Sequence, residues 1–390
     1  MTDSAATSRS LQPDVALLRW LALMLTPGMG PTRGHRLVQH FGNVERVFYA
    51  SLTELEAAGL PAVSAQSIAL GKSYAAAEEE FMKARDCGAE IVTFDDQRYP
   101  QRLKQIYDPP LVLYLRGDVS LLKQAAIGVV GTRHPTPYGM GMAERLANDL
   151  ASRGMVIVSG MARGVDTSAH RGALNAKGRT VAVWGTGIDV PYPRDNRRLA
   201  EAIIASGGAL VSEFPVGSFA APQNFPIRNR IISGLSLGVL VVEAGEYSGT
   251  RITARCALEQ GRDIFAVPGN VTNRNSWGPN TLIKQGAKLT ATWEDVWEEL
   301  PTEIKLQLEA NWRLESAKPQ EASLFADSQL SPHEKRIFAL LKPDETTQLD
   351  EIIEKLEAQV SSSEIFSALF ELELAGKIKQ LPGKNYVRSF

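Results

Sequence analysis

Cysteine and histidine are scarce in this sequence. Its 390 residues include two Cys and five His, and Cys87 and Cys256 stand far apart in the chain. The histidines are scattered singly, so neither a disulfide framework nor a zinc-binding cluster can be assembled from the spacing of these residues. We therefore expect a protein of a reducing compartment, the cytoplasm, with no bound metal and no cofactor.

Long apolar runs and an excess of one charge are also missing. No run approaches the ~18 apolar residues of a membrane-spanning helix, and the first ten residues are polar. We therefore expect neither secretion nor insertion into a membrane. The formal net charge is −2 at pH 7, which excludes a general polycation, so any binding of nucleic acid must depend on the local placement of Arg and Lys.

The standard signatures of nucleotide-binding proteins are absent as well. Residues 125–139, AAIGVVGTRHPTPYG, begin as an apolar strand and end in a turn before a helical pattern, which is the usual geometry for binding a phosphate at a helix N-terminus. The Walker pattern needs a Lys and a hydroxyl after its second Gly, and the dinucleotide fingerprint needs three Gly at fixed spacing. Here Gly131 is followed by Thr132, Arg133 and His134, so the turn indicates an anion without identifying it.

What the chain does contain is a series of short apolar runs between residues 86 and 300. Each of AAIGVVG, MVIVSG, TVAVWG, ALVSEF, GVLVVEAG and DIFAVPG is followed by a helical segment or a turn, and AEIVTF and PPLVLYLRG precede them. Continuous runs of Val, Ile and Leu are typical of strands covered on both faces of a parallel sheet. The pattern predicts an α/β fold with an extended, Rossmann-like, doubly wound parallel sheet over residues 86–300.

Glycine, hydroxyl and charged residues follow these strands. In such sheets ligands bind beyond the carboxyl ends of the strands, so we expect these residues to line a polar pocket suited to phosphate. Glycine after a single strand is ordinary turn chemistry, whereas Gly, hydroxyl and Arg at successive strand ends are not needed for packing. The strand-end candidates are Gly131, Thr132, Arg133, Ser159, Gly160, Arg163, Gly164, Asp166, Gly185, Gly187, Glu243, Ser248, Gly249 and Thr250.

A pair of arginines follows Phe225 and Pro226 in the segment APQNFPIRNRIISGLS. We expect the next helix to begin with Arg228, Asn229 and Arg230. Cations at a helix N-terminus oppose the helix dipole, so an anion bound between the two guanidinium groups would explain them. Phe225 either packs in the core or offers a platform on which an unpaired base stacks.

The first part of the chain, residues 1–85, has a helical pattern from residue 15 onward. The stretch TPGMGPTRGHRLVQHFGN is typical of a helix-hairpin-helix, in which a Gly-x-Gly turn offers backbone amides to a DNA phosphate. In the alternative, Gly28 and Gly30 only let two helices turn tightly. Residues 1–80 contain six Lys and Arg against eight Asp and Glu, which favours the structural role.

The last part of the chain predicts a separate small domain. Residues 301–328 are polar and uneven, which indicates a linker with one helix, and residues 329–390 have the three amphipathic helices and terminal hairpin of a winged helix. The expected recognition helix, SSSEIFSALFELELAG, carries Glu364, Glu371 and Glu373 and no Lys or Arg. We therefore favour a protein-contact or regulatory role for this domain over the reading of DNA.

A resemblance to a known family rests on motifs that occur in order along the chain. The motifs VVGTRHPTPYG, IVSGMARGVDTSAHRGAL, VWGTGIDVPYPRDNRRL, SEFPVG, NFPIRNRIISGLS, VVEAGEYSGTRITARCALEQGRDIFAVPGN and GPNTLIKQGA resemble the DNA-processing protein family DprA, also called Smf, across residues 90–290. The resemblance implies a front domain of sterile-alpha-motif or hairpin type, a winged helix behind, and a bacterial protein that binds single-stranded DNA. It further implies protection of incoming strands in natural transformation, loading of the RecA recombinase, and a homodimer formed through the sheet domain.

The family's binding residues fall, by motif, on the strand-end candidates given above. Tyr192 and Asn196 join them in the third loop, and the segment NFPIRNR matches the start of the strand-binding helix. Thr132 stands where the family more often has Ser, which keeps the hydroxyl. Gln223 leaves no Lys beside Phe225, so the affinity for DNA per site is expected to be lower than in a more basic relative.

An enzyme is the alternative from a different class. Rossmann-like nucleotide hydrolases, including LOG-like phosphoribohydrolases, are similar at the fifth loop, where a Gly-Gly-x-Gly-Thr run is followed by a catalytic Glu. Here SGTRITA places Arg251 after Gly-Thr, with no acid until Glu259, so the expected base is missing. Glu213 and Glu243 are the strand-end carboxylates that could substitute, and we interpret each as a partner that holds an Arg in place. We therefore predict a binding protein and not an enzyme.

Overall fold

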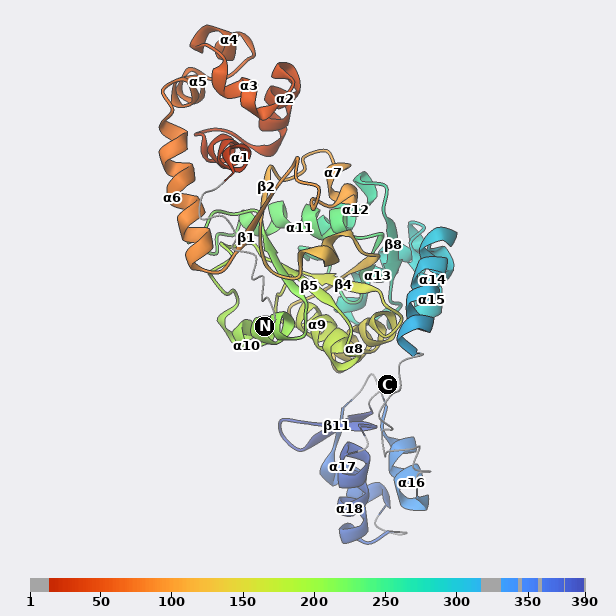
Figure 1. Cartoon of the computed structure of the whole chain (residues 1–390). Helices are drawn as coiled ribbons and strands as arrows, with labels where there is room; N and C mark the ends of the chain where they lie inside the picture. Colours follow the sequence, from red (N-terminus) through yellow and green to blue (C-terminus); the bar gives the residue numbers. More distant parts are fainter. Residues whose placement is uncertain (1–13, 317–330, 343–345, 357–359, 375, 389–390) are drawn as a thin grey trace, which may run out of the picture. The chain divides into compact units, whose positions relative to one another are not determined.

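The computed structural model describes residues 14–316, 331–342, 346–356, 360–374 and 376–388, and Figure 1 shows their arrangement. The chain divides into two compact units, Met1–Gln124 with Val181–Leu235, and Ala125–Thr180 with Ser236–Phe390. In the described ranges, no helix is long and apolar enough to cross a membrane.

Six helices open the first unit, as the sequence predicts. Asp14 caps the first of them with a side chain that accepts a hydrogen bond from the N–H of Ala16. Trp20 and Leu21 of the same helix are fully buried and anchor the packing of this part. The helices are α1 (Val15–Leu25), α2 (Pro31–Phe41), α3 (Val44–Tyr49), α4 (Leu52–Ala57), α5 (Ala62–Ala69) and α6 (Lys72–Asp86).

The α/β part of the chain contains nine strands in a mostly parallel sheet. In the first unit the strand order is β1-β2-β6-β5. β1 pairs antiparallel with β2, β2 pairs antiparallel with β6, and β6 is parallel to β5. These strands and their helices are β1 (Glu90–Thr93), α7 (Gln101–Lys104), β2 (Val112–Gly117), η1 (Val119–Lys123), β5 (Thr180–Val183), η2 (Arg194–Asn196), α10 (Arg197–Ala205), β6 (Ala209–Ser212) and α11 (Asn224–Leu235).

In the second unit the strand order is β4-β3-β7-β8-β9, and the β3–β4, β3–β7, β7–β8 and β8–β9 pairs are parallel. β3, β4 and β7 are buried along their whole length, which confirms that the continuous apolar runs are strands covered on both faces. The elements are β3 (Ala126–Val130), α8 (Pro137–Ala151), β4 (Val156–Ser159), α9 (Val165–Asn175), β7 (Gly238–Val241), α12 (Thr250–Glu259), β8 (Asp263–Ala266), η3 (Arg274–Ser276), α13 (Trp277–Lys284), β9 (Lys288–Leu289) and α14 (Trp293–Glu299).

The winged helix expected at the end of the chain is present. Ile337, Ile352, Ile365 and Leu372 belong to its buried core, and three short antiparallel strands lie in the order β10-β12-β11. Its elements are α16 (Pro332–Leu340), β10 (Thr347–Gln348), α17 (Leu349–Leu356), α18 (Ser362–Leu374), β11 (Ile378–Leu381) and β12 (Asn385–Arg388).

A helix occupies the first half of the predicted linker. This helix, α15, covers Thr302–Ser316, and the remainder of the predicted linker, residues 317–328, lies outside the described residues.

Candidate nucleic-acid interface

In the second unit, the loops that follow β3 and β4 are held against each other by their backbones. The N–H of Val165 donates to the carbonyl of Thr132 at 3.2 Å. Gly164 has φ +77°, and a Cβ added there would lie 2.5 Å from the same carbonyl, so only glycine fits. The two predicted loops are therefore joined through their backbones.

Glu243, at the end of β7, fixes the first of these loops. Its backbone carbonyl accepts from the N–H of Thr132 at 2.7 Å. Its carboxylate accepts from the N–H and the Oγ1 of Thr136, at 2.9 and 2.5 Å, and from Asn275 Nδ2 at 3.4 Å. The interpretation that Glu243 holds an Arg is therefore wrong, because the partners of this carboxylate are a helix-capping Thr and an Asn.

Asp166 orders the loop after β4 by accepting hydrogen bonds from its backbone. Its Oδ2 accepts from the N–H groups of Gly160 and Ala162, at 3.1 and 3.2 Å. Ser159 is fully buried, and its hydroxyl donates to the carbonyl of Val129 at 2.6 Å. Ser159 and Asp166 thus act on the protein's own backbone, and they shape the loop that carries Arg163.

Arg133 and Arg163 are the two predicted arginines of this unit, and both are exposed. Each is displayed from one of the two loops that are bonded to each other. A guanidinium group on a rigid, Gly-rich loop at a strand end is suited to contact a phosphate with two N–H groups at once. Gly131, Thr132 and Gly164 are half-buried beside them.

The loop after β7 forms the start of α12. Ser248 Oγ accepts from the N–H of Thr250 at 3.2 Å, as expected for a residue that satisfies the first turn of a helix. Gly249 is exposed at the N-cap position. Arg251, which the sequence places where a hydrolase has its Glu, lies with its guanidinium 5.2 Å from the centre of the Trp277 ring.

In the first unit, Phe225 packs against Gly185 and Tyr192. Phe225 Cδ1 would lie 2.8 Å from a Cβ at Gly185, so the ring occupies the space that a side chain there would fill. The rings of Tyr192 and Phe225 are 5.3 Å apart at an interplanar angle of 34°. Tyr192 is 42% exposed, so this aromatic pair presents a ring to solvent.

The helix that carries the two expected arginines begins earlier than predicted. α11 starts at Asn224, so Phe225 and Pro226 lie in its first turn and Arg228 and Arg230 lie in its second. Proline is compatible with the first turn of a helix, where its missing N–H has no partner to lose. The predicted start of the helix at Arg228 is therefore wrong.

Both of these arginines are buried. Arg230 Nε lies 2.9 Å from Asp108 Oδ2, and its Nη2 lies 2.7 Å from Glu213 Oε2. This confirms the interpretation that Glu213 holds an Arg in place. Burial raises the pKa of Glu213, and the positive charge of Arg230 opposes that shift.

Arg228 and its neighbour Asn229 are tied into the same region. Arg228 Nη1 donates to the carbonyl of Val183, at the end of β5, and its Nε donates to Asn229 Oδ1 at 3.2 Å. Gly187 lies in the neighbouring loop, where its N–H donates to the carbonyl of Ser218 at 2.9 Å. Asn196 is buried at the start of α10.

Three residues that order the site were missed from the sequence: Thr136, Asn275 and Asp108. Thr136 had a readable signal, since Thr followed by Pro before a helical pattern is typical of an N-cap with proline at the first helical position. Asn275 and Asp108 had none, because they are far in sequence from the groups they bind. Among the described residues, no group of three or more His, Cys, Asp or Glu is arranged to hold a metal ion.

The fold and these loops define a class: a Rossmann-like α/β protein with a helical N-terminal part and a winged helix. Residues 90–301 match the family model for DNA recombination-mediator protein A, and residues 318–384 match the DprA winged helix domain. The chain belongs to the DprA/Smf family of DNA-processing proteins.

Known relatives match over most of their length. Protein Smf of Synechocystis is 33% identical over 396 residues, which cover 95% of this chain and 98% of that protein. Protein Smf of Escherichia coli is 41% identical over 305 residues, covering 76% and 77%. The X-ray structure of DNA processing protein A from Streptococcus pneumoniae has a TM-score of 0.66 at 34% identity, and the match covers 73% of this chain and 98% of that one.

Proposed function

We propose that this protein binds single-stranded DNA without sequence preference, and that it protects incoming strands and helps to load RecA during natural transformation. The observation that carries the proposal is the display of Arg133 and Arg163 from two loops bonded to each other at the strand ends. Exposed arginines on loops that are joined to each other are suited to bind the sugar–phosphate backbone, which every sequence shares. In the first unit, the exposed ring of Tyr192 beside Phe225 supplies an aromatic surface on which bases stack.

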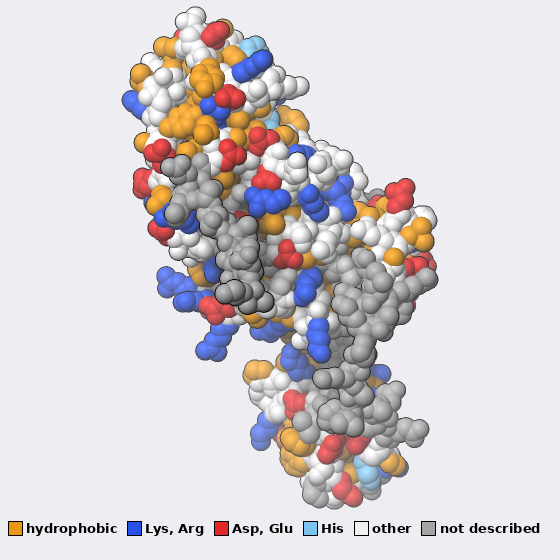
Figure 2. Space-filling view, viewed as in Figure 1, with side chains coloured by type: hydrophobic (Ala, Val, Ile, Leu, Met, Phe, Trp, Pro, Cys, Tyr) orange, Lys and Arg blue, Asp and Glu red, His pale blue; other side chains and the backbone are white. Residues whose placement is uncertain are grey.

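The charge distribution favours DNA binding through a few individual arginines over attraction by a positive field of the whole protein. On the face drawn in Figure 2, Lys and Arg side chains are interspersed with Asp and Glu, in agreement with the net charge of −2. Binding through a few placed arginines predicts a modest dependence of affinity on salt, since each phosphate contact releases about one counterion.

We also propose that the protein is not a hydrolase. Glu243 is 1% exposed and its carboxylate is occupied by Thr136 and Asn275, so it lacks the access to substrate that a general base needs. Glu259 is the last residue of α12 and pairs with Arg255 at 3.3 Å. Release of free base from nucleoside monophosphates, lost in Glu243→Ala, would contradict this proposal.

The test of the binding proposal is a competition between strands. A labelled oligo-dT is bound to the protein and followed by fluorescence anisotropy, while unlabelled single strand, duplex of equal length or a mononucleotide is added. We expect the single strand to displace the label at the lowest concentration. Binding of a labelled mononucleotide by a chain that does not bind the labelled oligo-dT would favour the nucleotide hydrolase. We propose that the full chain is a homodimer, and light scattering of the same sample tests this. We also propose that the protein is located in the cytoplasm.

A further inference from the structure

The recognition helix of the winged helix, α18, exposes two aromatic side chains. Phe366 of α18 is 49% exposed and Phe370 is 61% exposed. Because they are four residues apart, they are neighbours on one face of the helix. Exposed aromatic rings that adjoin one another are typical of surfaces that contact another protein.

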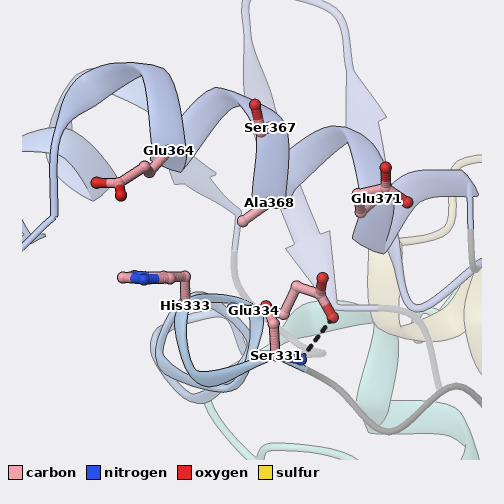
Figure 3. A pocket seen from close by; sticks show the side chains of 7 residues that line it. All are labelled: Ser331, His333, Glu334, Glu364, Ser367, Ala368 and Glu371. Carbon is pink, nitrogen blue, oxygen red and sulfur yellow. Dashed lines mark hydrogen bonds between the residues drawn. The ribbon is translucent and has the colours of Figure 1, made fainter.

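A hollow of about 260 Å³ lies between α16 and α18, on the adjoining face of α18. Figure 3 shows Glu364, Ser367 and Glu371 along α18, opposite His333 and Glu334 at the start of α16. Ser367 lines the hollow and is three residues from Phe370, so the two are neighbours on the surface of α18 and the hollow adjoins the exposed rings. We call this surface the α16–α18 face; the hollow is lined by Ser331, His333, Glu334, Glu364, Ser367, Ala368 and Glu371.

Two of the three carboxylates of the hollow are held by helix capping. Glu334 Oε2 accepts from the N–H of Ser331 at 3.0 Å, and Glu364 Oε2 accepts from the N–H and the Oγ of Ser361 at 3.0 and 2.7 Å. The hydrogen bonds from Ser361 lower the pKa of Glu364, so this group stays charged. Glu371 is exposed at the other end of the hollow.

These features exclude the ligands that a winged helix is usually suspected of binding. Three carboxylates repel the phosphates of a DNA groove, and like charges placed together oppose binding strongly. The same repulsion opposes a symmetric contact between two copies of this face. Within the described parts of the chain, no metal-binding group of acidic and His residues is found.

We propose that the α16–α18 face binds a basic, amphipathic segment of a partner protein. A Lys or Arg of that segment enters the hollow between Glu334, Glu364 and Glu371, and its apolar side chains pack on Phe366 and Phe370. Charge complementarity sets the orientation of the segment, and the two rings supply most of the buried apolar area.

The test uses the full chain and two labelled helical peptides with the same apolar stripe, one with Lys and one with Glu on the polar face. We expect the Lys peptide to bind and the Glu peptide not to bind. Phe366→Ala with Phe370→Ala should weaken binding by about tenfold or more, and Glu371→Lys should weaken it by about fivefold at low salt. Glu354→Lys is the matched control, because it makes the same charge change on α17, which contributes no residue to the hollow.

Three results would overturn the proposal. One is equal binding of the two peptides, or of the native chain and the α18 variants, with circular dichroism showing that all variants fold. Another is a loss of duplex DNA binding in the double Phe variant, which would assign the face to DNA. The third is that the native chain forms oligomers larger than the proposed homodimer and that Glu371→Lys abolishes them. That result would mean that the face binds the basic wing of a second copy, which contains Lys377, Lys379 and Lys384.

Discussion

At the scale of single residues, the arginines at the strand ends fall into two kinds. Arg133 and Arg163 are exposed on loops, whereas Arg228 and Arg230 are 5% and 6% exposed. The sequence predicts that all four contact phosphate, because the position of an Arg at a strand end or a helix start does not show whether it binds a ligand or another side chain. Glu213, 17 positions from Arg230, was predicted from the sequence to hold an Arg, whereas Asp108 lies 122 positions away and no local pattern reveals its contact.

Arg230→Ala should therefore lower stability. The change leaves Glu213 buried and Asp108 half-buried without their cation, and loss of one partner of a buried ion pair costs about 3–5 kcal/mol. Urea denaturation of the native and variant chains measures the free energy of unfolding. Arg198→Ala, at an exposed position of α10, is the control and should unfold as the native chain does. An Arg230→Ala chain of native stability that has lost only its affinity for DNA would contradict this assignment.

Glu243→Ala should loosen the loop that carries Arg133. The change removes the acceptor of the Thr136 N–H and Oγ1. A fully buried donor without a partner costs about 1–3 kcal/mol, and Thr136 is half-buried, so we expect a loss at the lower end of this range. Thermal unfolding measures the loss, and Glu243→Gln, which keeps one carbonyl acceptor, should lose less. Equal unfolding of the three chains would show that the carboxylate does not order this loop.

At the scale of elements, the sequence predicts the strands well and the helix boundaries less well. Eight apolar runs correspond to β1 to β8, because a strand covered on both faces needs consecutive apolar residues. β9 was missed, since Lys288–Leu289 is too short to carry a pattern. The start of α11 was predicted too late, at Arg228, whereas the helix begins at Asn224 and holds Pro226 in its first turn, where proline is accepted.

The contact between the β3 and β4 loops makes a prediction about Gly164. A methyl group at Gly164 meets the Thr132 carbonyl at 2.5 Å and requires φ +77°, so Gly164→Ala should displace both loops and weaken binding of oligo-dT. Gly261→Ala is a suitable control, because Gly261 also has a positive φ, +65°, but nothing lies within 4 Å of a Cβ there and it is not a candidate for binding. Anisotropy titrations compare the two variants, and equal affinities would mean that the paired loops are not needed for binding.

His35 of α2 makes the first unit sensitive to acid. Its Nε2–H donates to the carbonyl of Pro109 at 2.8 Å, and its ring packs edge-on against Phe94 at 4.3 Å. Burial lowers the pKa of His35 below its ordinary value of 6.5, and the bond to Pro109 and the charge of Asp108 oppose that shift. The unfolded chain therefore takes up the proton first, so the stability due to neutral His35 is complete above pH 6.5 and is lost as the pH falls below it.

Thermal unfolding across this range measures the effect. The midpoint of the native chain should fall as the pH drops from about 7.5 to about 5.5, and the midpoint of His35→Gln should fall by less. Parallel curves for the two chains would show that His35 does not titrate on unfolding.

At the scale of the whole molecule, the chain contains an α/β part, which we propose binds DNA, and a winged helix whose recognition helix is acidic. Removal of residues 321–390 should leave the affinity for single-stranded DNA unchanged, because the recognition helix α18 carries carboxylates and exposed Phe in place of Lys and Arg. The family could be recognised from the sequence because its motifs occur in order along the α/β part. The pairing of buried side chains could be seen only in the folded structure. Loss of affinity in the truncated chain, with the number of subunits in the oligomer unchanged, would show that the winged helix contributes to DNA binding.

The most direct test of the central claim is an anisotropy titration of labelled oligo-dT with the native chain and Arg133→Ala at several salt concentrations. Arg171→Ala serves as the control, since Arg171 is also exposed but lies on α9, beyond the loop that carries Arg163. If Arg133 contacts a DNA phosphate, its loss weakens binding and reduces the slope of log affinity against log salt by about one, while the control behaves as the native chain. An unchanged slope and affinity in Arg133→Ala would contradict the claim that the loop after β3 holds the DNA backbone.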